Sequence, residues 1–245
     1  MVFQHGLCGD CGQTAQVFPT SAGFRRVTLE CRGHGASDCG PLERLSIAQF
    51  TDDLAAVIEA DALGPCVVGG ISMGAAVALR LAVTRPDLVS ALVLARPAWL
   101  VGDAPQNMAP NALVGDLLRR FAPAEAAQRF EASAIAADLA GTAPDNLASL
   151  RGFFQRLPVA QTAALLGRIS ADGPGVTLAD LGRLQIPVLV IGTTRDHVHP
   201  IALARQLAGL IPAASFAEIT SKATDAALYR ADFQSALFAF LKGLP

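Results

Sequence analysis

The stretch that decides the fold is "GGISMGAA", residues 69–76. It follows the short apolar run "PCVVG" and leads into "AAVALRLAV", whose composition predicts a closely packed helix. A serine between two glycines at such a junction is typical of a strained strand-to-helix turn, which holds a nucleophilic hydroxyl at its apex. The sequence therefore predicts that Ser72 is a nucleophile; the plainer interpretation is a glycine-rich turn with a capping serine.

Short apolar runs like this one recur along the chain and alternate with helical patterns. Such alternation predicts an α/β fold, in which a mostly parallel sheet has helices on both faces. One crossover helix is predicted over residues 46–64, where Ser46 and Gln49 have the spacing of a capping box and Gly64 provides a stop. Six runs are predicted as strands: residues 1–4, 25–30, 65–70, 90–95, 186–192 and 214–220.

Residues 98–183 interrupt this rhythm. They contain several helical stretches separated by Pro, Gly and Asp, and no convincing strand. The predicted organisation is a core formed by residues 1–97 and 184–245, with residues 98–183 as a helical insertion before the penultimate strand.

Composition limits the classes of partner. The chain is 52% hydrophobic and 16% charged, which suits one domain with a large core. Its formal net charge is −2 and it has no run of Lys or Arg, so neither nucleic acid nor a membrane surface is an expected partner. We expect a small neutral or weakly charged molecule instead, and a homodimer as the default oligomer.

The sequence lacks the patterns typical of membrane-spanning, secreted and nucleotide-binding proteins. No apolar run reaches the roughly 18 residues of a membrane span, and no secretory leader pattern opens the chain, so a cytoplasmic location is expected. The five cysteines fit reduced thiols better than disulfides. No GxGxxG or GxxxxGK[ST] motif occurs, so no cofactor is expected.

Cys8, Cys11, Cys31 and Cys39 could form a zinc site with thiolate ligands, or they could simply pack as small apolar side chains. The second interpretation is preferred, because Cys31 and Cys39 are more widely spaced than the ligand pairs of such zinc sites.

Three further motifs surround the serine in a fixed order. "FQHGLCGD" (residues 3–10), "LECRGHGASD" (29–38) and "VLVIGTTRDHVHP" (188–200), together with GxSxG at 70–74, resemble segments of the α/β-hydrolase superfamily. The resemblance extends over nearly the whole chain and is nearest to serine hydrolases of the esterase and enol-lactonase type. Two departures are visible: Glu30 stands where the family usually has Asp, and the two N-terminal edge strands of the family are expected to be absent.

The resemblance implies a division of roles among residues of this chain. Ser72 would attack a carbonyl carbon, and Asp196 would be the acid that orients the base. The backbone N–H groups of Leu7 and Met73 would form the oxyanion hole. The implied function is hydrolysis of an ester, lactone or related carbonyl bond through an acyl-enzyme. The insertion at residues 98–183 falls where the family carries its helical lid. It contains Phe153 and Phe154, which favours a small, mostly apolar substrate.

The base is the unsettled member of this set. The family places a histidine in the loop after the last strand, but here that loop reads "EITSKATDAALYRADF", with the expected position near Ala223 or Thr224. His199 is the preferred displaced base over His197, because a histidine adjacent to its acid in sequence rarely reaches it. A solvated loop histidine is the plainer interpretation of both. His5 and His34, the other two histidines, lie in motifs where the family uses histidine structurally.

Three alternatives to a displaced histidine stay open. Lys222 could act as the base if burial lowered its pKa, although a surface lysine is the simpler interpretation. An alanine in the loop could be an engineered replacement for histidine. Alternatively, catalysis has been lost and the pocket only binds a carbonyl ligand, for which Tyr229 could supply a hydrogen bond. Asp103 is considered as a repositioned acid, but Asp196 fits the family pattern better.

Overall fold

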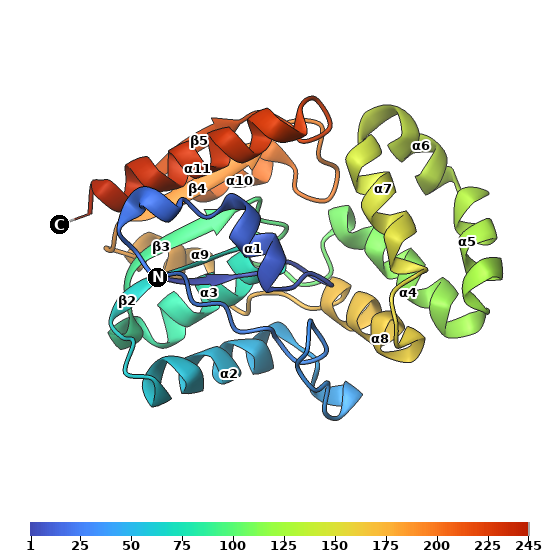
Figure 1. Ribbon diagram of the computed structural model, residues 1–245, viewed down its shortest axis with the longest axis horizontal. Helices are drawn as coiled ribbons and strands as arrows, with labels where there is room; N and C mark the ends of the chain where they lie inside the picture. Colours follow the sequence, from blue (N-terminus) through green and yellow to red (C-terminus); the bar gives the residue numbers. More distant parts are fainter. Residues whose placement is uncertain (245) are drawn as a thin grey trace.

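The structure is a computed structural model that describes residues 1–244, apart from the side chain of Ala22. Its centre is one five-stranded sheet in the order β1-β2-β3-β4-β5, with every pair parallel (Figure 1). The predicted α/β class with a parallel sheet is confirmed. The strands are β1 (Val2–Gln4), β2 (Cys66–Ile71), β3 (Val89–Ala95), β4 (Val188–Thr193) and β5 (Ala214–Ile219).

The predicted strand at residues 25–30 is wrong. Only Val27 joins the sheet, as an isolated parallel bridge beside Val2. Two backbone hydrogen bonds hold it: Phe3 N–H donates to the Val27 carbonyl, and Val27 N–H to that of Met1, at 2.8 and 2.9 Å. At the next step the Thr28 hydroxyl, rather than a backbone N–H, donates to the Phe3 carbonyl, so the ladder ends there.

Alternation along the buried strands divides the core between the two faces of the sheet. Val68, Leu92 and Val190 belong to one apolar cluster, which contains residues of α2, α3, α9 and α10. Val67, Val93 and Ile191 point the other way and join a cluster with residues of α1 and α11. The helices around the sheet are α1 (Cys11–Val17), α2 (Ile47–Ala60), α3 (Met73–Thr84), α9 (Leu178–Arg183), α10 (Ile201–Leu210) and α11 (Ala226–Lys242).

Helix α2 begins as predicted, but without the second half of the capping box. The Ser46 hydroxyl accepts from the N–H of Gln49 at 3.0 Å. The Gln49 side chain does not reach back to Ser46, because its oxygen accepts from Arg44 and its nitrogen donates to Asp53. Competing side-chain partners therefore override the local motif.

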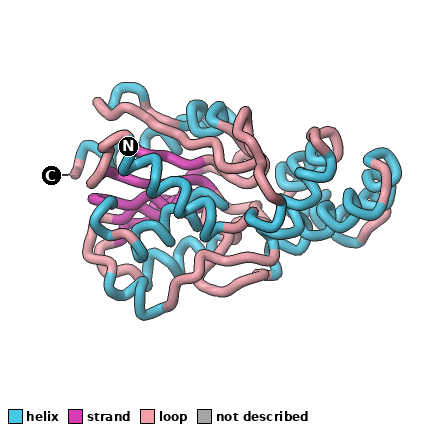
Figure 2. The backbone as a smooth tube through the Cα atoms, turned by 90° about the horizontal axis from the view of Figure 1, so that it is seen from below, coloured by secondary structure: helices cyan, strands magenta, loops and turns pink. Residues whose placement is uncertain are grey.

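Residues 98–183 contain helices and no strand. Five of them form a group that extends from one end of the sheet, and many of its apolar side chains form a third apolar cluster (Figures 1 and 2). These helices are α4 (Ala109–Arg120), α5 (Pro123–Glu131), α6 (Ala134–Thr142), α7 (Pro144–Phe153) and α8 (Val159–Ser170). None of the helices in residues 1–244 has both the length and the apolar character that crossing a membrane requires.

Candidate functional site

The turn after β2 has the strained geometry that its sequence predicts. Ser72 has φ 57° and ψ −113°, a conformation that a non-glycine residue adopts only when its surroundings enforce it. Its N–H donates to the Ala95 carbonyl at 2.9 Å, which ties the turn to β3. A side chain at Gly70 would overlap the backbone of Gly74, and a Cβ on Gly74 would lie 2.6 Å from the Gln4 carbonyl oxygen. Both glycines are therefore required, as the pattern predicts.

A cavity of about 100 Å³ lies against Ser72 at the carboxyl ends of the strands. Open α/β sheets usually bind their ligands at this edge. A larger hollow of about 910 Å³ lies between residues 42–46 and α8, but it includes none of the residues expected to act. Size alone therefore does not identify the site. The smaller cavity is lined by Gly6, Leu7, Gln13, Ser72, Arg96, Met108, Asn111, Asn146, Ser149, Leu150, Phe153, Val198 and His199.

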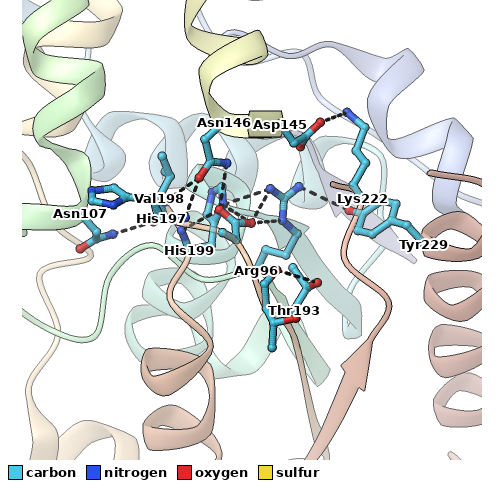
Figure 3. Close-up of polar contacts among 12 residues, drawn as sticks. Arg96, Asn107, Asp145, Asn146, Thr193, His197, Val198, His199, Lys222 and Tyr229 are labelled. Atoms are coloured by element: carbon cyan, nitrogen blue, oxygen red, sulfur yellow. Dashed lines mark hydrogen bonds and ion pairs between the residues drawn. The ribbon is translucent and has the colours of Figure 1, made fainter. Parts of the chain in front are cut away.

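Asp196 and His199 are directly hydrogen bonded. His199 Nδ1 lies 2.9 Å from Oδ1 of Asp196, and the backbone N–H of His199 donates to the same oxygen at 3.1 Å (Figure 3). The His199 side chain is only 10% exposed, so the interpretation as a solvated loop histidine is wrong for this residue. That interpretation holds for His197, which is exposed. Within residues 1–244, the buried Nε2 atom of His199 has no hydrogen-bond partner.

Arg96 shares the carboxylate with His199. It directly follows β3 with φ 47°, and its Nε and Nη2 atoms donate to Oδ2 of Asp196 at 2.8 and 2.6 Å. Its Nη1 atom donates to the hydroxyl of Tyr229 at 3.4 Å. Tyr229 is otherwise packed against Phe233, with ring centroids 6.0 Å apart. The tyrosine thus supports the arginine and belongs to the packed face of α11, and it is not among the cavity-lining residues.

Burial and charge set the protonation of this group. Burial alone would raise the pKa of Asp196, but the charge of Arg96 and the contacts with His199 hold it well below its ordinary value. For His199, burial is the largest influence and lowers the pKa; Asp196 opposes this effect, and Arg96 adds to it. Asp196 is therefore ionised and His199 neutral near pH 7, so Nε2 can act as a proton acceptor if Nδ1 carries the proton toward Asp196.

Asn146, at the start of α7, fixes the loop that carries these residues. Its Nδ2 atom donates to Oδ1 of Asp196 at 3.0 Å. Its Oδ1 atom accepts from the N–H groups of His197 and Val198 at 2.6 and 3.1 Å. Both polar atoms of the carboxamide thus connect the helical insertion to the loop after β4 (Figure 3).

The two backbone groups expected to receive an oxyanion adjoin Ser72 from different sides. Leu7 lines the cavity, and Met73 is the first residue of α3, directly after the serine. In the segment before α1, the N–H of Gly6 donates to Gln13 Oε1 and that of Gly9 to the Gly6 carbonyl. No described residue accepts a hydrogen bond from the N–H of Leu7.

The remaining histidines lie outside the cavity lining. His5 and His34 are buried against each other with ring centroids 4.7 Å apart. His5 Nε2 accepts from the N–H of Cys31 at 3.0 Å, and His34 Nδ1 lies 3.0 Å from the Arg32 carbonyl oxygen. Burial is the main reason that the pKa of His34 falls to about 3. Both residues connect loops, as expected from their motifs.

The other candidate residues also lie away from the serine. Lys222 forms an exposed ion pair with Asp145 at 3.3 Å and does not line the cavity, so its selection as a base has no support. Ala223 and Thr224 do not line the cavity either, and Asp103 is exposed.

The cysteines offer little to a metal ion. Burial raises the pKa of the Cys8 and Cys31 thiols to about 12, which keeps them protonated. Residues 1–244 contain no group of three His, Cys, Asp or Glu side chains arranged to hold a metal.

Sequence reasoning missed Arg96, Asn146, Asn111 and Gln13. For Arg96 a signal existed, because a charged residue directly after an apolar strand lies at the edge where ligands bind. The others offered none, since an isolated polar residue on an amphipathic helix is ordinarily solvated.

Comparisons with known proteins agree with this fold. A family model described as "alpha/beta hydrolase fold" matches residues 1–228. The protein BpoC of Mycobacterium tuberculosis, named as a non-heme bromoperoxidase, is 29% identical over 205 residues, or 81% of this chain and 75% of that protein. Its solved structure has a TM-score of 0.70 at 22% identity and covers 100% of this chain and 92% of that one.

Two solved enzymes have the same architecture. The enol-lactonase from Burkholderia xenovorans LB400 has a TM-score of 0.72 at 24% identity, covering 98% of this chain and 90% of that one. A thermophilic esterase from Thermogutta terrifontis has a TM-score of 0.69 at 23% identity, covering 98% and 85%. Because the family model spans most of the sequence, the chain belongs to the alpha/beta hydrolase fold family.

Proposed function

We propose that this enzyme of the hydrolase fold cleaves an ester or lactone of a small acid through an acyl-enzyme on Ser72. The observation that carries the proposal is the pairing of two groups in one cavity. Ser72 and His199 both line it, Nε2 of His199 has no hydrogen-bond partner among residues 1–244, and Nδ1 of the same imidazole is hydrogen bonded to Asp196. A nucleophile, a neutral base and an acid that orients the base are the three parts that serine catalysis needs.

The chemistry follows from these groups. His199 Nε2 takes the proton of the Ser72 hydroxyl while the oxygen attacks the carbonyl carbon, and the carbonyl oxygen becomes an oxyanion. The N–H groups of Leu7 and Met73 stabilise that charge, with the positive end of the α3 dipole adding to the effect. The imidazolium then protonates the departing alkoxide, which leaves an acyl-enzyme. Water, deprotonated by the same imidazole, releases the acid and restores the serine.

His199 and Ser72 do not form a hydrogen bond in this structure. Catalytic hydrogen bonds are often long without substrate and tighten in the complex, so the arrangement stays compatible with a base in this position. A buried imidazole nitrogen with no partner is costly, and approach to the serine would remove that cost.

The class of bond that we propose is cleaved is supported by the names of similar structures, and the kind of substrate by the lining of the cavity. Similar structures bear the names enol-lactonase and esterase. The cavity lining is mixed, with Leu7, Leu150 and Phe153 beside several polar side chains, whereas Phe154 is buried against Phe130. We therefore replace the expectation of a mostly apolar substrate with a small substrate that also carries polar groups.

Labelling with a fluorophosphonate tests the nucleophile without assuming a substrate. We expect covalent modification of Ser72, and hydrolysis of 4-nitrophenyl acetate that Ser72→Ala abolishes. Ser149→Ala is the matched control, because Ser149 also lines the cavity and should leave both signals in place. Mass spectrometry that locates no adduct on Ser72, or equal turnover by Ser72→Ala, would contradict the proposal.

A second candidate function is binding without turnover. It is favoured by Arg96, which shares the Asp196 carboxylate with His199 and lowers the basicity of the imidazole. Saturable binding of an intact ester, with neither labelling nor a burst of product, would support this candidate.

A further inference from the structure

Apart from Asn111 and the exposed Ser149, the polar side chains around the cavity fall into two groups. Both polar atoms of the Asn146 carboxamide have partners, Arg96 bonds Asp196 and Tyr229, and Oε1 of Gln13 accepts from Gly6. These groups are held by the protein and serve its architecture. Ser72 and Nε2 of His199 are the two atoms that the proposed reaction itself requires.

Asn111 fits neither group. It lies in the first turn of α4, lines the cavity, and is only 6% exposed. Its Oδ1 atom is buried and finds no hydrogen-bond partner among residues 1–244. Leaving a buried carbonyl oxygen unpaired is costly, and such groups nearly always have a partner. The missing partner is therefore expected inside the cavity.

We infer that Asn111 is a specificity-determining residue that accepts a hydrogen bond from a hydroxyl group on the acyl part of the substrate. The inference rests on the proposed function for the site and deepens it. Oδ1 requires a donor, so a group that only accepts, such as a carboxylate, cannot be its partner. A cationic donor is disfavoured because the guanidinium of Arg96 lines the same cavity. An uncharged donor, such as the hydroxyl of a short hydroxy acid, satisfies both conditions.

The size of the cavity restricts the acyl group further. A cavity of about 150 Å³ holds a benzene ring, so the roughly 100 Å³ beside Ser72 holds on the order of four non-hydrogen atoms. A glycolyl group has that size and carries a hydroxyl, and a propionyl group has the same size without one. The inferred substrate class is accordingly an ester or lactone of a two- or three-carbon hydroxy acid.

Methyl glycolate and methyl propionate are the matched probes, because one replaces a methyl group with a hydroxyl. We expect the protein to hydrolyse methyl glycolate with a kcat/KM at least about tenfold higher, since a site built for a hydroxyl rejects the analogue that lacks it. Asn111→Leu, of similar size, should remove or reverse this preference. Asn111→Ala should also reduce it, which keeps the test usable if the leucine variant does not fold. Gln128→Leu removes an exposed carboxamide from the same insertion and should leave the ratio unchanged.

Binding to Ser72→Ala separates this inference from the catalytic proposal. Ligand-observed NMR with that variant measures affinity for the two esters without turnover, and the additional Asn111→Leu change should again remove the preference. If no ester is cleaved but the binding preference depends on Asn111, catalysis fails and the specificity role stands. If the two esters are cleaved and bound equally, or if Asn111→Leu leaves both ratios unchanged, the inference is overturned and the partner of Oδ1 is water.

Discussion

Asp196 shows how single contacts make a buried charge tolerable at this site. One carboxylate oxygen accepts from His199 and from Asn146, and the other accepts two hydrogen bonds from Arg96. A carboxylate with a 4% exposed side chain would be strongly destabilising alone, but here each oxygen is satisfied and a positive charge adjoins it. The same contacts keep the imidazole oriented, so charge compensation at Asp196 and the orientation of His199 depend on one another.

The pH dependence of turnover tests His199 as the base. Because its pKa lies below the ordinary value of 6.5, the midpoint of the acidic decline in kcat/KM, where the imidazole becomes protonated, should lie below pH 6.5. Arg96→Met removes a charge that lowers this pKa, so the decline should move to higher pH. Profiles between pH 4 and 8 measure both.

The control for this experiment is Arg120→Met, which removes an exposed arginine from the insertion. It should leave the profile unchanged. Circular dichroism must confirm that Arg96→Met is folded, because breaking a buried pair costs about 3–5 kcal/mol. An acidic limb that stays in place in folded Arg96→Met would exclude His199 as the titrating base.

The residues of the site differ in how far the sequence predicts them. Ser72 has a local signature, because two glycines and a strand-to-helix junction lie within eight residues of it. Asp196 and His199 are three residues apart in sequence, and their contact could be anticipated as one of several options. The contact of Arg96 with Asp196 joins residues 100 positions apart, and that of Asn146 joins residues 50 apart. No local pattern encodes such pairs, since they depend on how the strands and the insertion meet.

Among the elements, the crossing of α3 over β1 imposes the most exacting requirement. Gly74 approaches β1 so closely that an added Cβ would lie 2.6 and 2.7 Å from the carbonyl oxygens of Gln4 and His5. Backbone atoms cannot rotate away as a flexible side chain can. We therefore expect Gly74→Ala to lower the free energy of unfolding by about 2 kcal/mol or more, measured by urea denaturation.

Gly167→Ala is the matched control for this substitution. Gly167 lies within α8 with nothing near the position of a Cβ, so alanine should stabilise the protein by about 0.5–1 kcal/mol through its higher helix propensity. Equal effects of the two substitutions would show that the close approach at Gly74 is not rigid.

Strands that are buried on both faces are predicted correctly from the sequence, whereas the strand predicted at residues 25–30, beside the edge of the sheet, is not. Strands β2, β3 and β4 are apolar on both faces, and their continuous apolar runs identify them in the sequence. Residues 25–30 have a similar β-branched pattern, but they adjoin only the edge strand β1, where side-chain hydrogen bonds compete with the ladder. The β propensity of residues 25–30 is therefore not enough to form a strand, because this segment has a neighbouring strand on one side only and competing hydrogen bonds there.

At the scale of the molecule, the helical insertion is attached to the core at several separate points. Arg156 and Gln161 both donate to the Gly33 carbonyl, at 2.6 and 2.7 Å. Arg168 donates to the carbonyl groups of Glu43 and Leu45. These bonds hold one side of the insertion, while Asn146 connects the other side to the loop of Asp196 and His199. The insertion thereby contacts the loop that carries His199, the proposed base, without supplying that residue.

Asn146→Leu tests whether that connection matters for the reaction. The substitution removes three hydrogen bonds and leaves the backbone N–H groups of His197 and Val198 without their acceptor, so the free energy of unfolding should fall by about 2–4 kcal/mol. The rate of fluorophosphonate labelling should fall as well, because the loop no longer holds the imidazole in place.

Arg151→Met provides the control, since it disrupts only an exposed ion pair between Arg151 of the same helix and Glu131, and it should cost less than about 1 kcal/mol. The two readouts separate a structural role from a positioning role. Reduced stability with an unchanged labelling rate means that Asn146 only fastens the insertion to the core. A slower labelling rate at temperatures where the variant is fully folded means that the insertion also aligns His199, which would make the attachment of these helices part of the catalytic arrangement.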